Sequence, residues 1–177
     1  MTGALDLSEP RHLLAKLSYE IDRLIAEPRD SYAAINALRD AYHLREWIWH
    51  GRLENDTALQ TLITGQRAEG TPKQRECKWN KYVNGAFKNG AFEDFRLIRE
   101  LCNGSKHFEK KSRDRVQATL AAGWGSRLFA YGKGMLGYGD DGLFVQVDGR
   151  GIVSVTYLLQ EVRKFWHEML VRYPHLG

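Results

Sequence analysis

The sequence predicts a mainly α-helical domain with a small β-hairpin before its last helix. Apolar residues recur at the 3.6-residue spacing of amphipathic helices throughout the first hundred residues. A glycine-dense stretch follows, and after it two short apolar runs, LFVQV and GIVSV, flank Asp148-Gly149-Arg150, which is typical of a hairpin. A length of 177 residues fits one domain. Its expected parts are a bundle core over 1–108, a glycine-rich loop and hairpin over 109–154, and a returning helix over 155–172.

Cap and breaker signals divide the first part into five helices. Proline and the capping residues Ser, Thr, Asp and Asn stand where helices begin, and glycine stands where they end. The expected bounds are Ser8 or Glu9 to Glu27, Asp30 or Ser31 to Gly51, Asn55-Asp56 to Gly65, Thr71-Pro72 to Lys81 or Tyr82, and Ala91 to Leu101 or beyond. The dipeptides Asn84-Gly85 and Asn89-Gly90 indicate turns.

The second of these helices has two contrasting faces. At 100° per residue, apolar side chains from Ala34 to Trp49 fill one broad face. The opposite line holds Asn36, Asp40, His43, Trp47 and His50. That line is either the solvated side of a surface helix or one wall of a functional cleft. Arg45 projects from the apolar face, so its side chain must snorkel to water or find a partner.

The remaining segments follow residue 108. VQATLAA, at 116–122, is ambiguous between helix and strand, whereas SRLFAYG, at 126–132, suits a short strand. Seven glycines lie between Gly123 and Gly142 and include two G-x-G-x-x-G matches. These glycines lead into a hairpin and not into a helix, so they do not predict a dinucleotide site. A glycine loop or hairpin tip is favoured, with a lid over a site elsewhere as the alternative.

Positive charge is concentrated in the centre of the chain. Residues 66–115 carry thirteen Lys or Arg and seven Asp or Glu, a net charge of +6 that leaves −2 for the rest. Aromatic residues alternate with these cations, a mixture that suits phosphate contacts and base stacking. The expected nucleic-acid contacts are Lys78, Trp79, Lys81, Lys88 and Ser105. The alternative is an amphipathic helix whose aromatic residues face the core.

Cysteine use and the N-terminal residues indicate a reduced, cytoplasmic setting. Cys77 and Cys102 form no CxxC pattern and give little support for a disulfide framework. Charges interrupt the N-terminal apolar positions, so neither a signal peptide nor a membrane span is expected there. His43, Glu46 and His50 have the residue types of a metal site, but the two histidines lie about 10 Å apart along a helix. We expect neither a metal nor a cofactor.

The segment RELCNGSKHF, residues 99–108, concentrates hydrogen-bonding groups around Gly104. If the helix continues through Gly104, Arg99, Asn103 and His107 line one face, and if it stops there, residues 105–107 lie on a loop. An ordinary C-cap beside a buried histidine is the bland alternative. The functional interpretation joins this segment to the second helix across a cleft. It makes His107 the acid or base, Asn103 its orienting partner, Lys106 and Arg99 the phosphate ligands, and His43 a contributor from the second helix.

This segment resembles the HEPN superfamily, helical bundles that often carry R-N-x-x-x-H within R-x4-6-H. Asn103 and His107 keep the N-x-x-x-H spacing, while Cys102 stands at the arginine position and Arg99 lies one turn earlier. A second formal match runs from Arg45 to His50, with Glu46 at the asparagine position. Most of the chain also resembles bacterial proteins without an assigned activity, which combine an AxHLxxWxW helix, an SKHF segment and a late hairpin.

The HEPN resemblance implies metal-independent RNA cleavage or nucleotide binding, in proteins of toxin or phage-defence type. Such proteins often act as homodimers or with a cognate protein partner, and no membrane is expected. Two other classes stay open. One is a non-catalytic module that binds a nucleic acid or a protein through the basic, aromatic segment. The other is a small-molecule pocket covered by the glycine loop.

Overall fold

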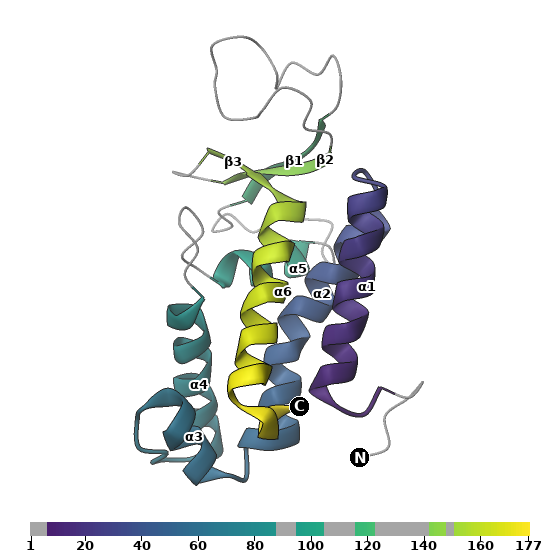
Figure 1. Ribbon diagram of the computed structural model, residues 1–177. Helices are drawn as coiled ribbons and strands as arrows, with labels where there is room; N and C mark the ends of the chain where they lie inside the picture. The colour runs from purple at the N-terminus through teal and green to yellow at the C-terminus, as the bar shows by residue number, and fades with distance from the viewer. Residues whose placement is uncertain (1–6, 88–94, 105–115, 123–141, 148–150) are drawn as a thin grey trace.

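The computed structural model describes residues 7–87, 95–104, 116–122, 142–147 and 151–177 (Figure 1). Helices make up most of these residues, so the predicted fold class is confirmed at the level of a helical bundle with a small sheet. The α-helices are α1 (Pro10–Ala26), α2 (Ser31–Ile48), α3 (Thr57–Thr64), α4 (Pro72–Ala86), α5 (Arg96–Gly104) and α6 (Val155–Arg172). Two short helical turns, η2 (Trp49–Leu53) and η4 (Pro174–Leu176), follow α2 and α6.

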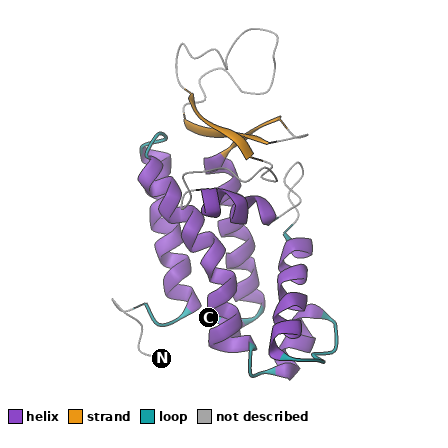
Figure 2. Ribbon diagram, turned by 180° about the vertical axis from the view of Figure 1, so that it is seen from behind, coloured by secondary structure: helices purple, strands orange, loops and turns teal. Residues whose placement is uncertain are grey.

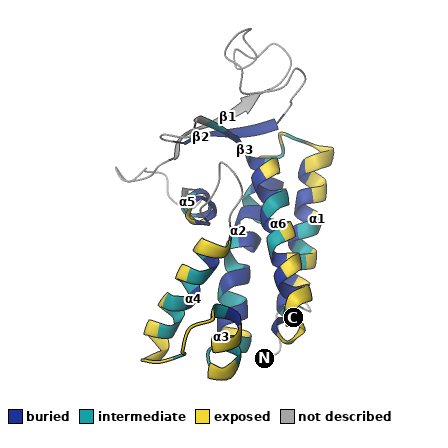
Figure 3. Ribbon diagram, turned by 60° about the vertical axis from the view of Figure 1, so that its left-hand side comes forward, coloured by how far each residue is buried: buried dark blue, intermediate teal, exposed yellow. Residues whose placement is uncertain are grey.

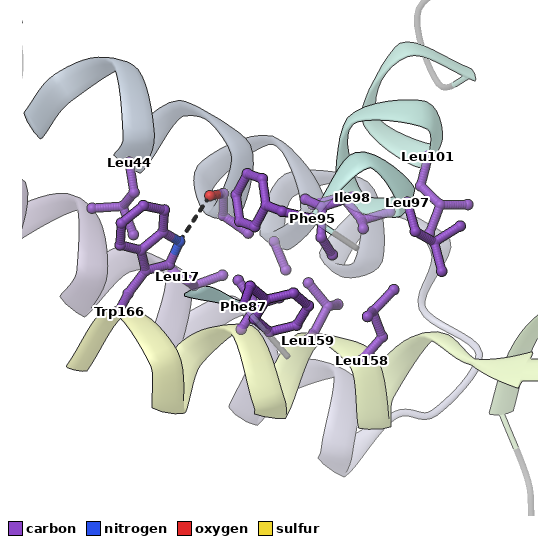
Figure 4. Close-up of a cluster of buried hydrophobic side chains, with 14 of the residues drawn as sticks. Leu17, Leu44, Phe87, Phe95, Leu97, Ile98, Leu101, Leu158, Leu159 and Trp166 are labelled. Atoms are coloured by element: carbon purple, nitrogen blue, oxygen red, sulfur yellow. Dashed lines mark hydrogen bonds between the residues drawn. The ribbon is translucent and has the colours of Figure 1, made fainter. Parts of the chain in front are cut away.

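Three long helices, α1, α2 and α6, pack around the main core (Figures 1 and 3). Trp166 of α6 is fully buried, and its indole Nε1 donates a hydrogen bond of 3.0 Å to the Ala41 carbonyl of α2 (Figure 4). Phe95, just before α5, meets the Trp166 ring edge-on at 5.7 Å between centroids. The Trp166 side chain therefore joins α6, α2 and the start of α5 in one apolar contact.

Several helix ends form where the sequence places them. Asp30 accepts hydrogen bonds of 2.9 Å from the backbone N–H groups of Tyr32 and Ala33 and so caps α2. Thr71 and Gln74 form a reciprocal capping box at the start of α4. Gly65 ends α3 in the left-handed conformation, with φ of 68°. These predicted boundaries are confirmed.

Two predicted glycine boundaries are wrong. Gly51 does not cap α2, because the chain continues through the π-helical turn η2, in which the Glu54 N–H donates to the Trp49 carbonyl at 2.8 Å. Gly85 lies inside α4 and not in a turn. Val83 and Phe87 on either side of it are buried, so packing of the last turn overrides the low helix propensity of glycine.

The predicted hairpin is present and belongs to a three-stranded antiparallel sheet. Its strands are β1 (Val116–Ala122), β2 (Gly142–Val147) and β3 (Gly151–Ser154), in the order β1-β2-β3. The ambiguous segment VQATLAA is therefore a strand, whereas SRLFAYG lies outside the described residues. Figure 2 shows the strands, in orange, at one end of the bundle. Ser154 ends β3 and caps α6, which begins at the predicted residue.

A polar seam joins α1 and α2. The Lys16 ammonium of α1 contacts the Asp40 carboxylate of α2 at 2.6 Å, and the Asn36 amide donates to the Glu20 carboxylate at 3.4 Å. Asp40 is only 8% exposed. This part of the polar line on α2 is therefore buried against α1, which corrects the interpretation of the whole line as a solvated face.

Among the described helices, none has both the length and the apolar character needed to cross a bilayer.

Candidate functional site

Helix α5 separates its apolar and polar side chains cleanly. Leu97, Ile98, Leu101 and Cys102 are buried against the core (Figures 3 and 4). Arg99 is exposed and Asn103, one turn later, is half-buried. Their i, i+4 spacing puts both on the outer face of α5, as predicted. Gly104 is the last described residue of α5, and Ser105, Lys106 and His107 lie outside the described residues.

The side chain of Cys102 lies in the core, at a position that does not suit a charged residue. Cys102 stands where the resemblance places an arginine, and its side chain is fully buried among apolar residues of the core. A guanidinium at that position would lose its hydration without an obvious ion partner, which is costly. Arg99, on the outer face, presents its cation to solvent instead.

Helix α2 packs against α5, so the two helices joined in the functional hypothesis are neighbours. His43 of α2 is half-buried, and its Nδ1 lies 2.8 Å from the Glu46 carboxylate one turn later. Within the described residues, no hydrogen bond joins His43 to Arg99 or Asn103. The two helices are neighbours, and the joint site of His43 with the α5 segment stays a prediction.

Arg45 is paired and does not snorkel. Its side chain is buried, and its Nη2 donates to the Tyr42 hydroxyl at 2.9 Å while its Cζ lies 4.5 Å from the centre of the Tyr42 ring. The same nitrogen contacts Oε1 of Glu46 at 3.4 Å. Tyr42, His43, Arg45 and Glu46 thus form one network on α2, which we call the His43 network.

The backbone beneath the His43 network is held by α4. The buried Trp79 indole donates to the Arg45 carbonyl at 3.1 Å, and its ring stacks on Tyr82 at 5.8 Å between centroids. Trp79 is only 1% exposed, so the prediction that it stacks on a base is wrong. Trp79 and Val83 occupy the same apolar face of α4, which is the alternative that the sequence left open.

The lysines predicted to bind nucleic acid have different environments. The Lys78 ammonium donates to the carbonyls of Arg67 and Glu69, at 3.0 and 3.2 Å, and so ties the preceding loop to α4. Lys81 is exposed, and Lys88 lies outside the described residues. An open hollow of about 420 Å³ separates that loop from α4, and its lining is Glu69, Gly70, Gln74, Cys77, Lys78 and Lys81.

Two described groups have a pKa raised by burial, Asp40 in the α1–α2 seam and Tyr82 on α4. Burial raises the pKa of Asp40 above its ordinary value, and the hydrogen bond and charge of Lys16 oppose that rise without cancelling it. His43 and His50 each contact a different carboxylate, those of Glu46 and Glu54. In the ranges that the structure describes, no group of three His, Cys, Asp or Glu residues could hold a metal ion.

Sequence reasoning missed the partnership of Glu46 with His43. The i, i+3 spacing of the two residues is visible in the sequence, where it suggests a metal site together with His50 and does not by itself indicate a histidine–carboxylate pair. Tyr42 gave no separate signal, because its ring also belongs to the apolar face of α2.

This chain matches no family model, and neither the curated proteins nor the solved structures include a match to it.

Proposed function

We propose that the chain is a HEPN-like, metal-independent endoribonuclease that acts in the cytoplasm as a toxin or phage-defence protein. The supporting observation is the outer face of α5, which places Arg99 and Asn103 one turn apart immediately before residues 105–107. The proposal adds His43 from α2, the helix that packs against α5. In this proposal His107 is the acid or base, Asn103 orients it, and Arg99 and Lys106 bind phosphate.

The proposed reaction uses the ribose of RNA as its nucleophile. The 2′ oxygen attacks the adjacent phosphorus while a base takes the 2′ proton, and the bond from phosphorus to the 5′ oxygen breaks as an acid protonates that oxygen. The products are a 2′,3′-cyclic phosphate and a 5′ hydroxyl. Cations close to the phosphate stabilise the charge that develops on its oxygens. Two histidines suit the proton transfers because their ordinary pKa lies near neutrality.

The environments of α4 give less support to a binding module centred on that helix. Trp79 belongs to the core, and Lys78 donates to loop carbonyls. Of the described residues on α4 that were predicted to bind nucleic acid, Lys81 is the exposed cation. We therefore propose that RNA binds on the α5 side of the molecule. A non-catalytic binding module is one of the outcomes that the test below can give.

The test is cleavage of labelled RNA by the purified chain in the presence of EDTA. We expect cleavage by the parent and a loss of at least about 100-fold in His107→Ala, because general acid–base groups contribute on that scale. Arg99→Ala should weaken cleavage and Lys73→Ala, an exposed cation on α4, should not.

Cleavage that is unchanged in His107→Ala would refute the catalytic assignment. A parent that binds RNA without turnover, and loses that binding when Lys78, Lys81 and Lys88 are replaced, would establish the non-catalytic module instead.

A further inference from the structure

The His43 network begins with a buried cation. Arg45 is 8% exposed, and its guanidinium contacts the Tyr42 hydroxyl, the face of the Tyr42 ring and one oxygen of Glu46, whereas its buried Nε has no hydrogen-bond partner among the described residues. A guanidinium so placed is costly to bury unless its partners stay in position. Arg45 therefore favours the conformer of Glu46 in which Oε1 points back toward it.

Glu46 divides its two oxygens between two partners. Oε1 faces Arg45 Nη2 at 3.4 Å and Oε2 faces His43 Nδ1 at 2.8 Å. An ionised carboxylate only accepts hydrogen bonds, so Nδ1 of His43 carries the proton. In neutral His43 the lone pair is then on Nε2, the nitrogen that points away from Glu46 and is able to accept a proton.

We propose that Glu46, held by Arg45 and Tyr42, is the positioning residue for His43, and that His43 Nε2 is the base of the reaction. The inference rests on the proposed ribonuclease function. In the step itself, Nε2 accepts the 2′ hydroxyl proton as the 2′ oxygen bonds to phosphorus. The leaving 5′ oxygen takes its proton from the general acid of that reaction, and His43 afterwards returns its proton to water.

The chain supplies a matched control for this network. His50 Nδ1 lies 3.0 Å from the Glu54 carboxylate, at i, i+4 across the π-helical turn η2 that follows α2. This second histidine is more open to solvent, with a side chain 56% exposed against 34% for His43. Among the described contacts, no arginine or lysine holds the Glu54 carboxylate. Glu54→Ala therefore removes a histidine–carboxylate contact of the same chemistry without disturbing the His43 network.

The first experiment does not depend on activity. Nitrogen-15 NMR of the full chain at about pH 8, above the ordinary histidine pKa of about 6.5, reports which ring nitrogen of His43 carries the proton. We expect Nδ1–H in the parent and in Glu46→Gln, which keeps an acceptor oxygen. Glu46→Ala should shift His43 toward Nε2–H, and Glu54→Ala should leave it unchanged. A parent His43 protonated on Nε2, or a Glu46→Ala spectrum identical to the parent, would overturn the inference.

The second experiment measures RNA cleavage by the same variants. Orienting partners of this kind are worth about 10- to 100-fold. Glu46→Ala should lower kcat by that factor with KM little changed, since Glu46 does not touch RNA, and Glu46→Gln should restore most of the rate. Glu54→Ala should match the parent. If the parent cleaves RNA and Glu46→Ala is equally fast, the inference about Glu46 fails while the proposed ribonuclease function stands. If the parent does not cleave RNA, the proposed ribonuclease function fails, and the NMR result still decides whether Glu46 positions His43.

Discussion

The polar line of α2 has two parts with different environments, Asn36 and Asp40 in the first and His43 in the second. Toward α1, Asp40 is buried and contacts Lys16, and the half-buried Asn36 donates to Glu20. In the His43 network, the imidazole is half-buried and its Nδ1 contacts the Glu46 carboxylate. The comparison teaches that burial and pairing give the first part a structural role, whereas the second part keeps a histidine that is partly open to solvent and is the one we propose for chemistry.

The largest expected effect comes from removing Trp166, which holds α6 against α2. Trp166→Ala deletes a fully buried indole and its hydrogen bond to α2, and should cost about 3–5 kcal/mol of unfolding free energy. Urea denaturation measures this loss. Val171→Ala, on the exposed side of the same helix, is the control and should change stability by less than about 0.5 kcal/mol. Equal effects of the two substitutions would contradict the central place of Trp166.

Asp40→Ala separates stability from activity. It leaves Lys16 without its 2.6 Å partner, and we expect a loss of about 1–3 kcal/mol in denaturation because a group in the seam loses its hydrogen bond. RNA cleavage by the remaining folded protein should be unchanged. Glu46→Ala should slow cleavage by the protein that remains folded, and it should also lose some stability because it removes a partner of the buried Arg45. The comparison breaks if Asp40→Ala slows cleavage as much as Glu46→Ala does.

A smaller effect is expected at the α4 contact. Trp79→Phe keeps an aromatic ring in the core but removes the hydrogen bond to the Arg45 carbonyl, at a cost of about 1 kcal/mol. Thermal unfolding reports the change. RNA retention measured on the same variant should equal that of the parent, since Trp79 is buried, and a large drop in retention would restore the stacking role that the structure argues against.

The smallest effect is the pH dependence carried by Asp40. Its pKa is raised in the folded state, so the folded chain binds this proton more tightly than the unfolded chain does. The contribution of Asp40 to stability therefore falls as pH rises from the ordinary Asp pKa of about 3.9 through the raised value. The difference in unfolding free energy between the parent and Asp40→Asn should decrease over that interval. An increase would mean that Lys16 outweighs burial.

Local signals predicted much of the fold. Asp30, Gly65 and the Thr71–Gln74 capping box act over a few residues, so their helix ends could be read from the sequence. Gly51 and Gly85 misled the prediction because tertiary packing decided whether those helices continued. Strand β1 was ambiguous because its sequence, VQATLAA, lacks a clear period, and its pairing with β2 depends on residues far away in sequence.

The parts of the candidate site that depend only on helix periodicity could be predicted from the sequence. Arg99 and Asn103 share a face for that reason, and Trp79 was misassigned because spacing between cations does not show which side of a helix meets the core. The role of Glu46 required knowing that Arg45 is buried beside it. His107, Lys106, Ser105 and Lys88 lie outside the described residues, and their roles stay predictions.

The π-helical turn η2 amounts to a single-residue insertion that α2 has absorbed without breaking. Residues beyond such an insertion are rotated by about 100° relative to an uninterrupted α-helix. Arg45 lies in α2 and His50 lies inside η2, so the second formal R-x4-H match runs into that turn. The spacing of the two letters in the sequence therefore does not fix the angle between the two side chains as it would on an uninterrupted α-helix.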